Sequence, residues 1–206
     1  KIAVYSPPDK QPWDDAVTLA LTYAEIDYDV IFDDEIFLGS LNKYDWLHLH
    51  HEDFTGQYGK FYKNYNRANW YVQQKADFEK RALKYGFSSV SEMKKAVART
   101  IKDYVLDGGF LFAMCSATDS YDIALAAENV DIVESVYDGS PVDPNYRQKL
   151  DYSKSFAFEN FDLYTSPLTY EYSTIDFPSS HRPIAKGAEA DYFTFLFSSC
   201  WEKYII

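Results

Sequence analysis

A three-layer α/β fold around a parallel sheet is predicted by two features of this 206-residue sequence. The first is the alternation of short apolar strands with amphipathic helices over residues 1–130, which is typical of parallel sheets. The second is the apolar run Phe110–Met114, because a central strand buried on both faces of such a sheet lacks polar residues. Over residues 131–206 the regularity fades, and we expect an irregular, aromatic, β-rich C-terminal elaboration of the same single domain.

The elements of residues 1–130 follow from hydrophobic periodicity and from the prolines and glycines that interrupt it. Strands are predicted at residues 1–6, 28–32, 46–50 and 110–114. Helices are predicted behind Pro12, over residues 66–85, from a Ser89–Glu92 capping box to Gly108, and from Asp122 onward. In the irregular part, short strands with a two-residue period are predicted at residues 156–158, 169–172 and 192–195.

Composition and charge exclude several classes of protein. The formal net charge of −12 argues against a nucleic-acid partner, because phosphate binding needs clustered Lys and Arg. Runs of eighteen apolar residues are absent from the sequence, so we expect no membrane-spanning helix. Cys115 and Cys200 form no CxxC pair, which excludes a zinc site of paired thiolates, and their spacing favours no disulfide. Both ends of the chain are apolar and lack a closing turn, so we expect truncation at both ends.

Cys115 is predicted to lie between a strand and a helix, with alanines at positions 113 and 117. Small neighbours are the steric requirement of a nucleophile elbow, and the carboxyl end of a parallel strand is where open α/β sheets bind ligands. A helix N-terminus also favours the thiolate, the reactive form of cysteine. The polar residues of the next turn either cap the helix or face the same crevice: Ser116, Thr118 and Asp119. The alternative is a buried cysteine that only fills space.

Three of the four histidines close the predicted strand at residues 46–50, and two carboxylates follow them. His48 and His50 are expected to point to one side of the strand and His51 to the other. Together with Glu52 and Asp53, they are suited to orienting a nucleophile or to binding a small molecule or peptide. Because neighbouring strand residues diverge and the sequence offers no second ligand pair, we predict neither a metal site nor a cofactor.

The elbow sequence Phe112-Ala113-Met114-Cys115-Ser116-Ala117, on a flavodoxin-like sheet, resembles the class I glutamine amidotransferase-like superfamily. Within it, the chain is similar to a bacterial family labelled asparagine synthetase B, chiefly over residues 1–22, 44–62 and 108–127. The present sequence has neither the N-terminal cysteine nor the SGGxDS motif of glutamine-dependent asparagine synthetases. The resemblance implies a flavodoxin-like fold, amide or ester hydrolysis or acyl transfer through Cys115, and export to the cell envelope.

In that superfamily the base that activates the nucleophile comes from a strand after the elbow. The histidine that follows Cys115 in this chain is His181, which lacks the superfamily's HxE pattern, so we expect an incomplete triad and a base from outside the chain. Two functions therefore stay open. The first is a cysteine-dependent hydrolase or acyltransferase, with a site lined by His50, Glu52 and Asp53. The second is a noncatalytic ligand-binding or complex-assembly component that uses the same crevice or a tyrosine-rich face.

Overall fold

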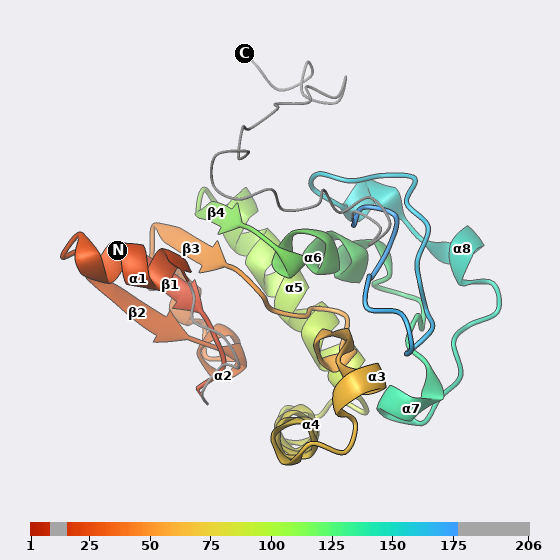
Figure 1. The fold of residues 1–206 in the computed structure, drawn as a ribbon. Helices are drawn as coiled ribbons and strands as arrows, with labels where there is room; N and C mark the ends of the chain where they lie inside the picture. Colours follow the sequence, from red (N-terminus) through yellow and green to blue (C-terminus); the bar gives the residue numbers. More distant parts are fainter. Residues whose placement is uncertain (9–15, 177–206) are drawn as a thin grey trace, which may run out of the picture. The chain divides into compact units, whose positions relative to one another are not determined.

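The computed structural model describes residues 1–8 and 16–176. Four short parallel strands form one sheet in the order β2-β1-β3-β4 (Figure 1). Their bounds are β1 Ile2–Tyr5, β2 Tyr28–Ile31, β3 Trp46–Leu49 and β4 Phe110–Ala113. Helices flank this sheet, so the predicted α/β class is confirmed, and the strand order is that of a flavodoxin-like sheet up to its fourth strand.

The helical elements of the described residues range from single turns to helices of four or five turns. The α-helices are α1 Ala16–Tyr23, α2 Asp33–Phe37, α3 Tyr62–Tyr65, α4 Asn69–Lys84, α5 Val90–Leu106, α6 Ser116–Ala126, α7 Ser135–Asp138 and α8 Tyr146–Lys149. The 3₁₀ turns are η1 Ser40–Lys43, η2 Tyr58–Lys60 and η3 Tyr152–Lys154. Even α5, with 17 residues, carries charged side chains along its length, and the described helices include no candidate for a membrane span.

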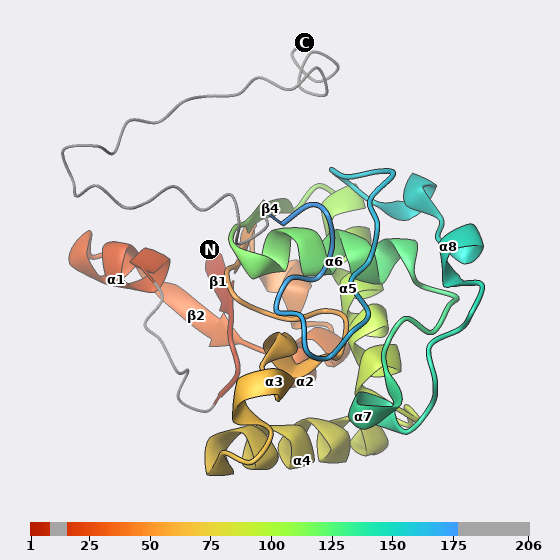
Figure 2. The same cartoon turned by 45° about the vertical axis from the view of Figure 1, so that its right-hand side comes forward.

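The crossovers decide which helix covers which face of the sheet. Connections between parallel strands are right-handed, and β1–α1–β2 runs across the sheet in the opposite direction to β3–α5–β4. The two connections therefore put α1 and α5 on opposite faces (Figures 1 and 2). Figure 2 also shows α4 running below α2 and α3 towards α7, where Lys75 donates a hydrogen bond to the carbonyl of Val136 at 2.9 Å.

Helix α5 forms where the sequence predicts it, and it supplies much of the core. The Ser89 hydroxyl accepts a hydrogen bond from the N–H of Glu92 at 3.2 Å, which satisfies one free N–H of the first turn. The Glu92 carboxylate reaches back to Ser88 rather than to Ser89, so half of the predicted capping box is present. Met93 and Val97 lie fully buried in one core cluster with the sheet residue Leu47.

Two expectations about strands are wrong in the described residues. The strand β4 is not buried on both faces: it lies at the edge of the described sheet, with Phe110 57% and Phe112 42% exposed. The segments 156–158 and 169–172 are not strands, and over residues 131–176 the β-structure is an isolated bridge between Leu163 and Ser173. Alternating aromatic residues suit a strand, but pairing needs a neighbouring edge that is free. The strand predicted at residues 192–195 lies outside the described residues.

Candidate functional site

The candidate site lies where the carboxyl ends of the four strands meet. The chain leaves β1 towards β2 on one side of the sheet and leaves β3 towards β4 on the other side. Open α/β sheets bind ligands at such a switch point, between the two adjacent strands from which the chain runs in opposite directions. The residues that follow each strand therefore gather at one edge: Pro7 after β1, Phe32 after β2, His50 after β3 and Cys115 after β4.

Cys115 has the backbone of a tight strand-to-helix turn. It is the N-cap of α6, with φ 52° and ψ −141°, a conformation that residues with a Cβ rarely adopt. Ala117, two residues on, is fully buried, so a larger side chain there would collide with the core. The Cys115 side chain is exposed at the mouth of this turn. The sequence predicts this placement, and the positive φ adds backbone strain of the kind that clusters at functional sites.

The end of β3 is pinned to the elbow by three hydrogen bonds. Met114 donates its N–H to the carbonyl of Leu49, and Ala117 donates its N–H to the carbonyl of His50, each at 3.1 Å. The hydroxyl of Ser116 donates to the carbonyl of His51, also at 3.1 Å. The carbonyls of three successive residues, 49–51, therefore all bind the segment 114–117, which fixes the two histidines beside the cysteine.

His50, His51 and Cys115 form a compact cluster. One imidazole nitrogen from each histidine and the Cys115 Sγ lie within 4.8 Å of one another. The rings of His50 and His51 have centroids 3.6 Å apart, so the prediction that these side chains point to opposite sides is wrong. The reason is that β3 ends at Leu49, and the alternation of side chains stops with the strand.

His48 lies inside β3 and is not a member of this cluster. Its ring is fully buried, stacks on Phe112 at 5.6 Å and lies 6.0 Å from the ring of His50. The two histidines therefore share a side of the strand, as the two-residue period predicts.

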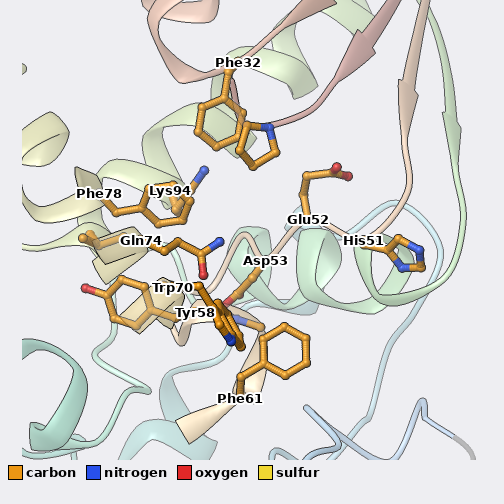
Figure 3. Close-up of a pocket in the computed structure, with 14 residues that line it drawn as sticks. Phe32, His51, Glu52, Asp53, Tyr58, Phe61, Trp70, Gln74, Phe78 and Lys94 are labelled. Carbon is orange, nitrogen blue, oxygen red and sulfur yellow. The ribbon is translucent and has the colours of Figure 1, made fainter. Parts of the chain in front are cut away.

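Next to the cluster lies a pocket with an acidic side and an aromatic side (Figure 3). His51 belongs both to the cluster with Cys115 and to the pocket wall. Glu52 lines the pocket and accepts a hydrogen bond from the backbone N–H of His50 at 2.7 Å. The aromatic rings come from the loop after β3, from the residue after β2 and from α4: Tyr58, Phe61, Phe32, Trp70 and Phe78.

Asp53 shapes the loop that forms one wall of this pocket. Its carboxylate accepts hydrogen bonds from the N–H of Thr55 at 2.7 Å, from the Thr55 hydroxyl at 2.6 Å and from the N–H of Gly59 at 2.9 Å. Gly56 has φ +84°, and a Cβ there would lie 2.6 Å from the Cα and N atoms of Ser91. At Gly56 the backbone of this loop therefore packs closely against the start of α5.

A buried ion pair that sequence reasoning missed lies beside the pocket, which its lysine, Lys94, lines. The Lys94 ammonium donates to both carboxylate oxygens of Asp33 at 2.9 Å and to the Tyr5 hydroxyl at 2.8 Å, and Tyr5 also bonds Asp33. Burial lowers the pKa of Lys94, while the Asp33 carboxylate opposes that shift. The signal was present in the sequence, because Lys94 falls on the apolar stripe of α5 between Met93 and Val97.

The other residues predicted for the site lie around the start of α6. Thr118 donates its backbone N–H to the carbonyl of Cys115 at 3.1 Å. Asp119 is buried, and burial together with the nearby Asp176 carboxylate raises its pKa to about 8. Burial lowers the pKa of the neighbouring Lys60 to about 8, against the effect of carboxylates among which Asp53 acts most strongly and Asp176 and Asp119 less. This cluster is a separate buried group of charges, so the structure does not bring Asp119 to Cys115 through any described contact.

Comparisons with protein-family models, with curated proteins and with solved structures find no match to this chain. His181 and Cys200 lie outside the described residues. The assignment of function therefore depends on the chemistry of the cluster and the pocket.

Proposed function

We propose that the chain is a class I amidotransferase-like domain that hydrolyses an amide or ester, or transfers its acyl group, through Cys115. The observation that carries the proposal is an exposed thiol on a strained strand-to-helix turn, with two imidazoles beside it. An adjacent base and a fixed, exposed position are what a weak nucleophile needs for covalent catalysis. The adjoining pocket of aromatic and acidic residues, which His51 also lines, is the surface that the rest of the substrate would contact.

The roles follow from the geometry of the cluster. The Cys115 thiol gives its proton to a histidine nitrogen, and the thiolate attacks the substrate carbonyl carbon. The tetrahedral intermediate collapses to a thioester while the imidazolium returns the proton to the departing amine or alcohol. Water then attacks the thioester and releases the acid. His51 is the preferred base because it belongs to both the cluster and the pocket wall.

The developing negative charge on the carbonyl oxygen needs hydrogen-bond donors. The N–H of Ala117 already donates to the carbonyl of His50. The N–H of Ser116 is the first of α6, and an α-helix does not use its first N–H groups internally. We therefore assign the Ser116 N–H as the donor to the oxyanion.

Acetylation by p-nitrophenyl acetate at pH 7 tests the proposal. The full chain is expected to release p-nitrophenolate and to carry an acetyl group on the Cys115 peptide, which mass spectrometry locates; Cys115→Ala removes it. His51→Gln should slow acetylation about a hundredfold by removing the base. His181→Gln, which removes the histidine that follows Cys115 in the sequence, should leave the rate unchanged.

A noncatalytic binding component gives the opposite result. In that case no acetyl group accumulates on Cys115, and iodoacetamide labels Cys115 and Cys200 at equally slow rates. A loss of acetylation in His181→Gln with none in His51→Gln would instead move the base to the downstream segment.

A further inference from the structure

We propose that His50, His51 and Cys115 bind a zinc ion. In tetrahedral zinc sites the Zn–N and Zn–S bonds of about 2.0 and 2.3 Å hold neighbouring donors roughly 3.3–3.7 Å apart. The two imidazole nitrogens and the Cys115 Sγ lie within 4.8 Å of one another. A closure of about 1 Å, by side-chain rotation of the exposed Cys115 and the half-buried His51, therefore brings the three donors to zinc geometry.

The backbone of the site is organised before any ion binds. The carbonyls of His50 and His51 are held by the Ala117 N–H and the Ser116 hydroxyl, in the first turn of the helix that Cys115 caps. Two of the donors come from the end of β3 and the third from the end of β4, and strand pairing places these ends side by side. Metal binding then costs side-chain rotamer freedom without reorganisation of the backbone.

The donor set selects the kind of metal. Two imidazoles and one thiolate suit zinc and its relatives, whereas magnesium and calcium prefer oxygen donors. Three protein ligands leave a fourth position for water or a substrate atom, and the exposed Cys115 gives the ion a path from solvent. The Glu52 carboxylate, which accepts the backbone N–H of His50, adds negative charge beside the site.

Zinc in this position blocks the chemistry proposed for Cys115. The ion takes the sulfur electron pair that would attack a carbonyl and the histidine nitrogen that would accept the thiol proton. The zinc-bound chain is therefore an inhibited state, a consequence that rests on the proposed function. Metal binding itself does not depend on that function.

Cobalt(II), which replaces zinc and absorbs light, tests the site in the full chain. Wild-type protein is expected to bind one cobalt ion with a thiolate-to-cobalt charge-transfer band, and zinc should displace it. Cys115→Ala should abolish the band, and both Cys115→Ala and His51→Gln should weaken zinc binding at least about tenfold. Cys200→Ser is the matched control and should keep both the band and the affinity.

The proposal is overturned if wild-type protein of native circular dichroism gives no charge-transfer band, or if the band persists in Cys115→Ala. It is also overturned if saturating zinc leaves the rate of Cys115 alkylation unchanged, a readout that needs no variant to fold. A chain with the cobalt band but no acetylation by p-nitrophenyl acetate keeps the metal site and refutes the proposed function. Acetylation without the band refutes the metal site alone.

Discussion

Replacement of Lys94 by Met tests the buried ion pair behind the pocket. Lys94 and Asp33 have side chains 2% and 0% exposed, and the ammonium lies 2.9 Å from both carboxylate oxygens. The methionine side chain fills a similar volume, so the variant removes the charge with little loss of packing. In the variant the Asp33 carboxylate still accepts the hydrogen bond from the Tyr5 hydroxyl, but it no longer has a cation beside it.

The expected cost is large because both partners are out of water. Removing one member of a buried ion pair costs about 3–5 kcal/mol of unfolding free energy, since the remaining charge stays buried. The ammonium also lies 4.2 Å from the centroid of the Phe32 ring, and loss of that cation–π contact adds roughly 1 kcal/mol. For a domain of this size a total loss of about 5 kcal/mol corresponds to a fall in Tm of roughly 10–20 °C.

Urea unfolding at pH 7 measures this loss, with Lys84→Met as the matched control. Lys84 pairs with Asp34 at the surface, where its side chain is 61% exposed and water screens the pair, so the control should lose little unfolding free energy. The double variant Asp33→Asn/Lys94→Met removes both charges and should recover about half of the single variant's loss. A Lys94→Met variant as stable as Lys84→Met, or a double variant no better than Lys94→Met, would refute the argument.

Two further predictions concern the loop after β3 and the buried carboxyl groups. In urea unfolding, Gly56→Ala should lose at least about 2 kcal/mol more unfolding free energy than the control Gly86→Ala. Both glycines have φ near +80°, but only at Gly56 would a Cβ collide with the Ser91 backbone. Equal losses in the two variants would contradict this prediction. The pKa of Asp119 is raised from 3.8 to about 8, so between these pH values the folded chain binds a proton that the unfolded chain has released. The contribution of Asp119 to the free energy of unfolding therefore becomes less favourable as the pH rises from 4 to 8. Asp119→Asn should therefore gain stability relative to the wild type from pH 5 to pH 8, and a stability difference that stays constant over this range would contradict the argument.

Hydrophobic periodicity predicts most of the regular elements, because the spacing of apolar residues reflects which face of a helix or strand is buried. The strands β1, β2 and β3 and the helices α4 and α5 lie where the pattern expects them, within a few residues at each end. The pattern also locates β4, but it wrongly predicts that β4 is buried on both faces, and it fails for the segment after residue 130. An apolar run says that a strand needs burial but does not say how many neighbours it has, and a two-residue period without a partner strand forms no sheet.

The sequence alone determined that Cys115 sits between a strand and a helix and that histidines follow the preceding strand, because small residues, glycines and local periodicity act over a few positions. Only the tertiary structure decided that His50, His51 and Cys115 meet, since strand pairing joins positions more than sixty residues apart. The same holds for Tyr5, Asp33 and Lys94, whose attraction depends on a shared water-free interior that no local pattern encodes.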